Sequence, residues 1–369
     1  MIKKKLQFIF KTFFQKLFKI FYGSIKKFDT FESKSFKKIN LTNIKSDIFP
    51  EKKYNLYEIL NGRIYTDTVE NVAIIKNNKI IPDMSYQQIN GNLQPSELNK
   101  VLKIGTPKIK KKIKGTVFSL VQGASGNNYF HFLFDIIARL KMFEEVYNLS
   151  VIDYFYVSNE LSWQKKIFSL FGIEEKKLIN SDKYKHIEAD KIFAIDHPWY
   201  HKGRVHDEVK NIPSWLVFWL REKFLHMAKK FDSSEKIFID RSESKFNHCQ
   251  FQNNYEIISF LNTKGFTSYK VGQLDFFEQI YLFNSAKTII GPHGAAFSNI
   301  VFCKPKTNII EIIPKTHPSK KCQRLSKILD LNLFRVTTEE VKNDEKKSGD
   351  IKFTVKDMEE LLKKYSNFQ

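Results

Sequence analysis

The sequence predicts an α/β protein built from two α/β domains. Its 369 residues, of which 42% are hydrophobic, are enough for two hydrophobic cores. From residue 115 onward, short apolar segments typical of strands alternate with longer segments in which apolar residues recur every three or four positions. A second series of the same kind begins after residue 231. Strands that alternate with helices favour a doubly wound, mainly parallel sheet.

The first series predicts strands at 117–121, 154–157 and 192–195, and helices at 129–143 and 163–171. Residues 41–114 have a mixed pattern that suggests short strands added to the same domain. Residues 213–231 have the pattern of one amphipathic helix with a proline near its start. Polar residues follow this helix, and we therefore place the domain boundary after residue 231.

The second series begins directly after this boundary. It predicts strands at 236–239, 267–271, 288–290, 308–313 and 333–336, and helices at 255–262 and 276–284. A last helix is expected at 354–365, where Thr354 and Asp357 approximate a capping box. The two halves of the chain therefore predict two similar α/β domains.

The N-terminal segment, residues 1–28, predicts a basic amphipathic helix that lies on a membrane surface. Its apolar side chains recur at steps of three and four residues, and they are Leu6, Ile9, Phe10, Phe13, Phe14, Leu17, Phe18 and Phe21. Lysines interrupt any apolar run long enough to span a bilayer, namely Lys4, Lys11, Lys16 and Lys19. No small-residue cleavage site follows, so a signal peptide fits poorly. The alternative to an interfacial helix is a helix that packs on a domain.

The net charge of +21 is unevenly distributed. Residues 1–53 hold fourteen lysines and four acidic residues, and a second lysine cluster lies at 108–114. Both clusters lie outside the predicted α/β segments and no recognisable nucleic-acid-binding module accompanies them, so no nucleic-acid partner is expected. The cysteines, Cys249, Cys303 and Cys322, are scattered, which supports neither a disulfide framework nor a cysteine zinc site and indicates the cytosol.

The segment GPHGAAFSN, residues 291–299, predicts a strand, a tight turn and the start of a helix. Gly291, Gly294, Ala295 and Ala296 have small or no side chains, so the backbone can approach a ligand closely. His293 lies in the turn itself. The first amides of a helix and its positive dipole end bind anions, and in open α/β sheets ligands bind at this edge.

A second candidate site lies on the predicted helix at 129–143. His131, Asp135 and Arg139 are spaced by four residues and form one polar stripe on an otherwise apolar helix. Ionisable groups buried without partners would cost several kcal/mol. The stripe therefore lines an active site, or else Asp135 pairs with Arg139 within the helix while His131 caps a neighbouring element.

Two further residues interrupt predicted strands or follow them. Arg241 comes at the carboxyl end of the strand at 236–239, where a guanidinium can bind a phosphate through two hydrogen bonds. Glu311 interrupts the apolar strand at 308–313. It is either a salt-bridged core residue or an acceptor for a ligand hydroxyl.

These segments, taken in order, resemble glycosyltransferase family 61. The matching blocks are NYFHFLFDIIARL, IFIDRSES, FFEQIYLFNSAKTIIGPHGAAFSNIVFCKP and NIIEIIP, and together they extend from about residue 115 to residue 333. The most specific of them are HFLFD and GPHGAAFSN. The family pattern also has a second arginine several residues after the position of Arg241, and the sequence FNHCQ at 246–250 lacks it.

The resemblance implies a GT-B fold, in which two Rossmann-like domains face each other across a cleft. The expected parts are the membrane-surface helix at 1–28, an acceptor-side domain at 29–231, a nucleotide-sugar-binding domain at 232–345, and a C-terminal helix at 346–369 that returns to the first domain. It also implies inversion at the anomeric carbon, which requires a single base.

From these residues we expect a transfer that uses no metal and no cofactor besides the nucleotide-sugar co-substrate. Arg241, His293 and the amides of Gly294, Ala295 and Ala296 would neutralise the departing diphosphate. Asn299 and Glu311 would complete the donor site, with Glu311 binding a donor hydroxyl. Asp135 or His131 would take the acceptor proton, with a preference for Asp135, and Asn128 and Arg139 would support them.

The expected function is the synthesis of a bacterial surface polysaccharide such as capsule or lipopolysaccharide. The acceptor would be a saccharide or a lipid-linked glycan, and the enzyme would be cytoplasmic, attached peripherally to the inner face of the cytoplasmic membrane. Two alternatives stay open at this point. One is a metal-dependent hydrolase that uses His131 and Asp135, and the other is a catalytically inactive sugar-nucleotide-binding or scaffold protein.

Overall fold

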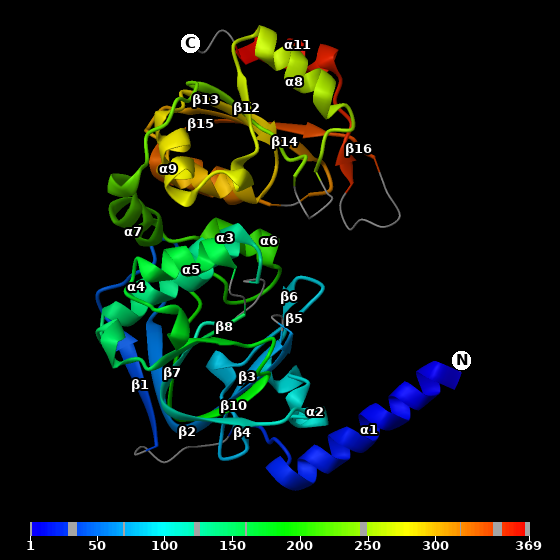
Figure 1. Cartoon of the computed structure of the whole chain (residues 1–369), viewed down its shortest axis with the longest axis vertical. Coiled ribbons are helices and arrows are strands. Elements are labelled where there is room, and N and C mark those ends of the chain that lie inside the picture. The colour runs from blue at the N-terminus through cyan, green and yellow to red at the C-terminus, as the bar shows by residue number, and fades with distance from the viewer. Residues whose placement is uncertain are drawn as a thin grey trace. The chain divides into compact units, whose positions relative to one another are not determined.

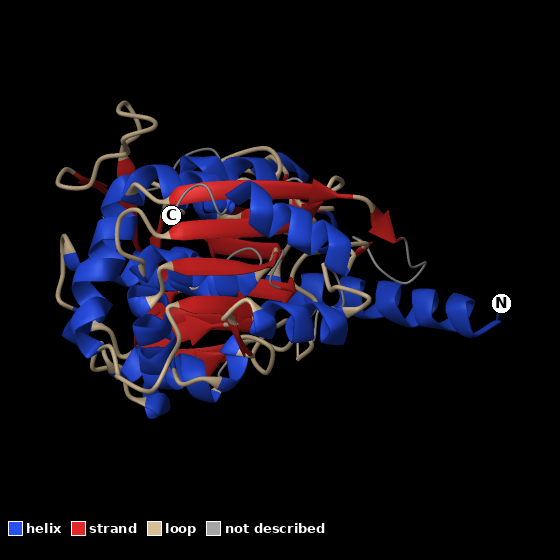
Figure 2. Cartoon of the chain, turned by 90° about the horizontal axis from the view of Figure 1, so that it is seen from above, coloured by secondary structure: helices blue, strands red, loops and turns tan. Residues whose placement is uncertain are grey.

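The computed structural model describes residues 2–28, 35–68, 71–121, 126–158, 161–243, 249–317, 319–341 and 349–365. The chain forms two compact units, Met1–Glu208 and Val209–Gln369 (Figure 1). Both contain sheets and helices, which confirms the α/β class (Figure 2).

The first unit is built on a ten-stranded sheet with the strand order β6-β5-β3-β2-β10-β7-β8-β9, to which β1 and β4 add through β2 and β3. Its strands are β1 (Phe36–Leu41), β2 (Tyr54–Thr68), β3 (Asn71–Lys76), β4 (Lys79–Ile80), β5 (Tyr86–Ile89), β6 (Asn92–Leu93), β7 (Lys111–Ser119), β8 (Tyr154–Val157), β9 (Leu178–Asn180) and β10 (His186–Ile195).

This sheet is mixed, and the prediction of a mainly parallel sheet holds for only part of it. β7, β8, β9 and β10 run parallel, whereas β1 to β6 pair in antiparallel fashion and join β10 through β2. The antiparallel part is made of hairpins, because Asn77 and Asn78, and likewise Asn90 and Gly91, have the positive φ of two-residue turns. The antiparallel strands β1 to β6 are the short strands that the sequence predicts before residue 115.

The helices of the first unit are α1 (Ile2–Tyr22), α2 (Val101–Ile104), α3 (Tyr129–His131), α4 (Ala138–Glu144), α5 (Ser162–Ser169) and α6 (Val205–Glu208). The longer helices lie at the predicted positions, whereas the short helices α2 and α6 were not predicted. A π-helical turn, η3 (Phe132–Ile137), joins α3 to α4 and makes one continuous helical segment after β7.

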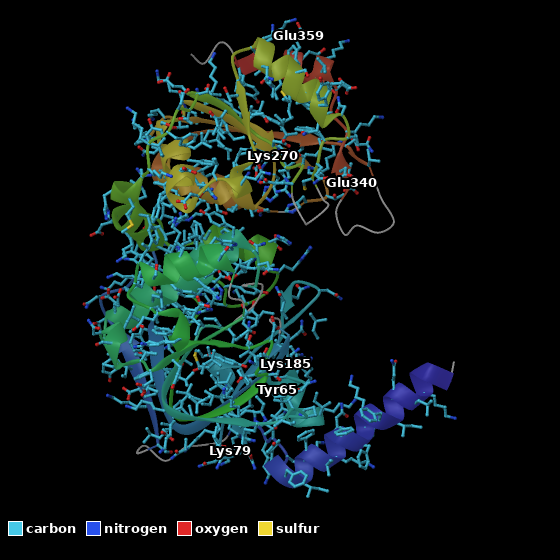
Figure 3. All side chains as sticks on the ribbon, viewed as in Figure 1. Tyr65, Lys79, Lys185, Lys270, Glu340 and Glu359 are labelled. Atoms are coloured by element: carbon cyan, nitrogen blue, oxygen red, sulfur yellow. The ribbon has the colours of Figure 1, made fainter. Side chains whose placement is uncertain are left out.

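The last turn of α1 packs on the rest of its unit. Lys19 Nζ donates to the carbonyl of Lys103 at 2.7 Å, and the Tyr22 hydroxyl accepts from the amide of Lys110 at 3.1 Å. Earlier turns expose large apolar side chains, including Phe8 and Phe10. Figure 3 shows side chains projecting from α1 along its length. No helix among the described residues combines the length and the apolarity needed to cross a membrane.

The second unit contains a five-stranded parallel sheet with the order β12-β11-β13-β14-β15. Its strands are β11 (Lys236–Ile239), β12 (Thr267–Tyr269), β13 (Thr288–Pro292), β14 (Asn308–Pro314) and β15 (Asn332–Thr338), and β16 (Glu340–Val341) and β17 (Asp350–Ile351) form a separate pair. All five strands of the main sheet lie where the sequence predicts them, so this unit has the doubly wound architecture.

Helices cover both faces of this sheet. α8 (Asn254–Thr263) and α11 (Val355–Tyr365) lie on one face (Figure 1), where they form a core with Phe238, Ile290 and Ile310. The other helical elements of the unit are α7 (Ser214–Phe224), η7 (Leu225–Met227), α9 (Phe276–Ser285), η9 (Ala295–Phe302) and α10 (Lys321–Leu329).

Two of these helices differ from the sequence-based expectation. α7 belongs to the second unit although the expected boundary follows it, because Arg221 Nη1 donates to the carbonyls of Val301 and Cys303 at 2.6 and 2.7 Å. α11 has the predicted capping box, yet it packs in the core of the second unit instead of returning to the first, because Met358 and Leu361 are buried there.

Candidate functional site

The candidate site of the second unit lies at the carboxyl ends of β11, β13 and β14. The strand order reverses between β11 and β13, and such a switch point is where ligands bind in open α/β sheets. Arg241 follows β11, His293 follows β13, and Glu311 lies in β14 opposite Gly291 of β13. The fold therefore brings together residues that are 70 positions apart in the sequence.

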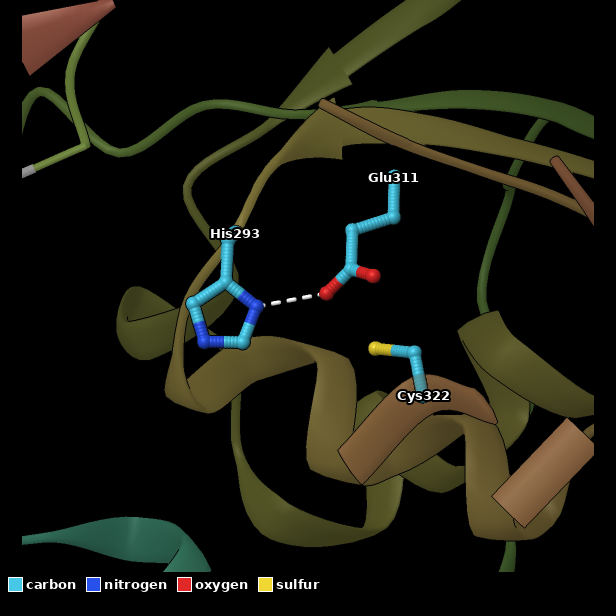
Figure 4. A group of neighbouring side chains, drawn as sticks. All are labelled: His293, Glu311 and Cys322. Atoms are coloured by element: carbon cyan, nitrogen blue, oxygen red, sulfur yellow. Dashed lines mark hydrogen bonds and ion pairs between the residues drawn. The ribbon is translucent and has the colours of Figure 1, made fainter. Parts of the chain in front are cut away.

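His293 and Glu311 form a buried pair at this edge (Figure 4). His293 Nδ1 lies 2.5 Å from Glu311 Oε1. Arg335 holds the other carboxylate oxygen, with Nε at 2.9 Å and Nη2 at 2.8 Å from Oε2. The β14–β15 register places Glu311 directly beside Arg335, so the arrangement is fixed by the strand pairing.

The charges of this pair follow from its surroundings. Burial alone would raise the pKa of Glu311, but the hydrogen bond from His293 and the charge of Arg335 lower it to about 2. Burial lowers the pKa of His293 to about 4, against the opposing effect of Glu311. At neutral pH, Glu311 is therefore a carboxylate that accepts the Nδ1 proton of a neutral His293, and His293 Nε2 carries a lone pair.

Two more cations border the turn that contains His293. The guanidinium of Arg241 lies over Gly294 so closely that a Cβ on this residue would be 1.4 Å from Arg241 Nη1. Lys321 Nζ donates to the carbonyl of Gly294 at 2.8 Å and lies 3.4 Å from Ser298 Oγ. Both side chains are buried, and burial lowers the pKa of each. The turn thus collects positive charge, which suits an anionic ligand.

The expected helix start after this turn is present as η9. Gly294 is its N-cap, so the amides of Ala295 and Ala296 belong to the first turn, where amides have no acceptor within the helix. Asn299 has a different place: its side chain donates to Gln279 Oε1 at 2.9 Å and links η9 to α9. The donor role of Asn299 stays a prediction.

The described residues also contain one group with the composition of a metal site. Ligand atoms of His293, Glu311 and Cys322 lie within 4.8 Å of one another (Figure 4). Glu311 is, however, already paired with Arg335, and Lys321 acts electrostatically on His293. Two neighbouring cations oppose the binding of a third.

In the first unit, the predicted polar stripe begins at a helix N-cap. Asn128 Oδ1 accepts from the amides of Phe130 and His131, at 3.0 and 3.3 Å. This cap fixes the start of α3 and with it the place of His131. Asn128 therefore contacts the backbone amides at the start of the helix, including that of His131. This position is compatible with the predicted supporting role.

Asp135 lies in the π-helical turn and is almost fully buried, with 1% of its surface exposed. Its Oδ2 lies 2.7 Å from His131 Nδ1 and 3.3 Å from His197 Nε2, and its Oδ1 accepts from Trp199 Nε1 at 2.9 Å. Burial would raise the pKa of Asp135, but the two histidines hold it well below its usual range. π-Helical turns are frequent at functional sites.

Arg139 is the third residue of the stripe and it is fully buried. Among the described residues, its three guanidinium nitrogens have no hydrogen-bond partner, so the expected alternative of an Asp135–Arg139 pair is not formed. Burial lowers the pKa of Arg139 to about 10, against the charge of Asp135. The stripe is thus a histidine–aspartate pair followed by a separate buried cation.

The structure therefore groups the predicted residues into two sites, one in each unit. His131 and Asp135 form the first, and Arg241, His293, Gly294 and Glu311 form the second. Four residues that contact these predicted residues were not predicted from the sequence, and they are His197, Trp199, Lys321 and Arg335.

Some of these residues carried a signal. His197 and Trp199 directly follow the strand predicted at 192–195, and Arg335 interrupts the apolar strand predicted at 333–336, just as Glu311 interrupts 308–313. Lys321 lies at the start of a helix that the sequence reasoning did not predict. The segment 246–248, where the second arginine of the family pattern was sought, lies outside the described residues.

Comparison with known proteins identifies one family. The model of the family described as Glycosyltransferase 61 matches residues 129–310, a range that includes the HFLFD and GPHGAAFSN segments. A search of curated proteins gave no match. Among solved structures, the chain is similar to a flavo di-iron protein mutant from Thermotoga maritima, at 9% identity over 90% of this chain and 99% of that chain, with a TM-score of 0.26. So low a score supports no argument about fold or function.

Proposed function

This chain belongs to glycosyltransferase family 61 and is a glycosyltransferase, and from that premise we propose that it moves a sugar from a nucleotide-sugar donor to a saccharide or lipid-linked glycan acceptor. The process would be the synthesis of a bacterial surface polysaccharide. The family match supports a glycosyltransferase over the two earlier alternatives, a metal-dependent hydrolase and an inactive sugar-nucleotide-binding or scaffold protein. The observation that carries the proposal is the set of buried cations at the switch point of the parallel sheet.

The donor diphosphate would bind at the turn between β13 and η9. Arg241 and Lys321 border this turn, and the first amides of η9 lie next to it. A guanidinium, an ammonium and a helix N-terminus are the groups that bind phosphate oxygens in proteins. This site would stabilise the negative charge that develops on the leaving diphosphate.

His293 would respond to the same charge. In the free protein it is neutral, because burial lowers its pKa to about 4. A diphosphate near Nε2 favours the protonated imidazole, which could then donate from both nitrogens, to Glu311 and to a phosphate oxygen. Glu311 would thus orient His293, in place of the role as acceptor for a donor hydroxyl that we expected from sequence.

For the acceptor, the geometry favours His131 as the base in place of Asp135. Asp135 already accepts hydrogen bonds on both oxygens and is buried. His131 directs Nδ1 to this carboxylate and keeps Nε2 for a proton. A carboxylate that orients a histidine in this way also stabilises the imidazolium formed when the histidine takes a proton.

We further propose inversion at the anomeric carbon, independence of metal ions and a GT-B arrangement of the two units. Family membership and the presence of two α/β units support the arrangement. The pairing of Glu311 with Arg335 supports the absence of a metal. Elemental analysis of the purified protein and activity in the presence of EDTA test this part: a stoichiometric metal whose removal abolishes turnover would contradict it.

The exposed apolar side chains of α1 suggest attachment to an anionic membrane surface on the cytoplasmic side. Phe10, Phe13 and Phe21 are exposed, and Lys11, Lys16 and Lys19 are on the same helix. Replacing Phe10 and Phe13 by serine should release the full chain from phosphatidylglycerol-containing vesicles but not alter its binding of donor. Equal sedimentation with vesicles by the variant and the wild type would contradict this anchor.

The central experiment is a thermal-shift screen with UDP-, GDP-, CMP- and dTDP-sugars. A donor at one hundred times its Kd stabilises a folded protein by about 3 kcal/mol, which gives a clear increase in melting temperature. Arg241→Ala should remove this increase, whereas Lys306→Met, which alters only an exposed ion pair with Asp330, should retain it. A donor that stabilises wild type and Arg241→Ala equally would contradict the phosphate site.

A further inference from the structure

Two histidines from different elements face the carboxylate of Asp135. His131, on α3, places Nδ1 2.7 Å from Oδ2, and His197, in the segment after β10, places Nε2 3.3 Å from the same oxygen. Trp199 donates from Nε1 to Oδ1 at 2.9 Å. An ionised carboxylate only accepts hydrogen bonds, so all three contacts require a donor on the partner.

The protonation of His197 follows from its other nitrogen. His197 Nδ1 accepts from the backbone amides of Trp199 and Tyr200, at 3.3 and 3.0 Å. A nitrogen that accepts cannot carry the proton of a neutral imidazole, so the proton is on Nε2 and is donated to Asp135. Burial also lowers the pKa of His197 to about 4, so the ring is neutral at neutral pH.

His131 has the opposite arrangement. Its Nδ1 faces the carboxylate and therefore carries the proton, which leaves the lone pair on Nε2. The two rings thus present different nitrogens to one carboxylate. Only His131 has a nitrogen that can accept a proton from a substrate without first losing its contact with Asp135.

Trp199 connects these groups to the backbone of the π-helical turn. Besides Asp135, its Nε1 approaches the carbonyl of Phe134 at 3.2 Å. A π-helical turn disturbs the regular backbone hydrogen bonds, and this contact gives the carbonyl a partner. The indole also packs against both imidazoles, with ring centroids 6.2 Å from His131 and 4.9 Å from His197. Trp199 is fully buried, so it fixes the relative position of the two histidines.

We propose that His197 and Trp199 are positioning residues for glycosyl transfer, which hold Asp135 as an anion directed at His131 and thereby keep His131 Nε2 available for the acceptor proton. This inference rests on the proposed function. In the transfer step, the acceptor O–H proton moves to His131 Nε2. The acceptor oxygen bonds to the anomeric carbon as the bond from that carbon to the diphosphate oxygen breaks, and the electron pair leaves with the diphosphate.

Arg139 acts electrostatically on His197, and Tyr86 and Asp196 act on Arg139. The cluster in turn acts on Tyr86, His201 and His206. Arg139 is the nearest cation in sequence and opposes proton uptake by His197. Burial lowers the pKa of His201 to about 2 and lowers that of His206 as well. Both rings are therefore neutral near neutral pH.

The test is nitrogen-15 NMR of the full chain labelled at histidine, with His131→Gln and His197→Gln used for assignment. At neutral pH, we expect His131 to be protonated at Nδ1 and His197 at Nε2. His197 should stay neutral down to about pH 4. The same tautomer in both rings, or an imidazolium signal of His197 near pH 7, would overturn the inference. No substrate is needed, so the outcome is independent of whether the proposed function is correct.

The chemical shift of the His131 Nδ1 proton in matched variants tests the positioning role. Trp199→Phe removes one donor from the Asp135 anion, which strengthens the hydrogen bond that Asp135 accepts from His131, so the Nδ1 proton should move downfield. Asp135→Asn removes the anion and should move it upfield. Trp163→Phe is the control, because Trp163 packs on Phe132 of the same helical segment. It should leave this chemical shift unchanged.

A change in the same direction for Trp199→Phe and Asp135→Asn, or a Trp199→Phe variant whose Nδ1 proton shift equals that of Trp163→Phe, would overturn the positioning role. Replacement of His197 by glutamine, which can still donate to Asp135, should stay closer to the wild-type proton shift than replacement by leucine. If these results hold but His131→Gln retains full turnover, the proposed base is wrong while the positioning of Asp135 stands.

Discussion

Replacement of Arg335 by methionine should destabilise the second unit by about 3 kcal/mol, at the lower end of what the loss of one partner from a buried ion pair costs. Arg335 contacts Glu311 Oε2 at 2.9 and 2.8 Å, and the Glu311 side chain is completely buried, whereas that of Arg335 is 19% exposed.

The assay is hydrogen exchange measured by mass spectrometry on peptides from β14 and β15, since unfolding of the whole chain need not be a two-state process. About 3 kcal/mol corresponds to exchange on the order of a hundredfold faster in these strands. The double variant Arg335→Met/Glu311→Gln should recover part of the loss, because it no longer buries an uncompensated charge.

Lys306→Met is the control for this variant, because it removes an ion pair with Asp330 whose two side chains are 68% and 66% exposed. Such pairs contribute about 0–1 kcal/mol. The reasoning is refuted if Arg335→Met exchanges no faster than Lys306→Met, or if the double variant is less stable than Arg335→Met alone.

Three further predictions concern other parts of the two sites. Gly294→Ala should weaken donor binding at least about tenfold, because its Cβ would lie 1.4 Å from Arg241 Nη1 and must displace the guanidinium. Calorimetry with the donor found by the screen measures the affinity, and an unchanged affinity would show that Arg241 does not bind phosphate. Asn128→Ala should lose about 1 kcal/mol of local stability in α3 by removing the N-cap, and exchange at the amides of Phe130 and His131 reports it, with Asn148→Ala, the cap of a different turn, as control. The second unit should lose stability as the pH falls from about 6.5 to about 4, because unfolded His293 binds a proton that the folded form does not, and again from about 4.5 to about 2 as Glu311 protonates. Folding lowers both pKa values, so both effects have the same sign. A His293→Gln/Glu311→Gln variant with the acid sensitivity of wild type would contradict the assignment.

The sequence determined the strands of the main sheet of the second unit in detail. Its strands are short apolar runs bounded by polar residues, and in a parallel sheet buried on both faces such runs are unambiguous. The site residues Arg241 and His293 follow these strands directly, so the rule that ligands bind at the carboxyl ends of strands was sufficient to locate them. The first unit was predicted less well, because the direction in which β1 to β6 pair depends on hairpin turns and on contacts with β10, and apolar alternation does not encode it.

The roles of the site residues were decided by tertiary structure. The spacing of His131, Asp135 and Arg139 predicted one stripe, but the π-helical turn and the donors His197 and Trp199 turn Asp135 into a buried anion that orients His131. The charge of Glu311 likewise depends on Arg335, which lies on the neighbouring strand β15. The physical reason is common to both sites: periodicity shows which residues share a face, whereas the charge of a buried group depends on partners that the fold brings from distant segments.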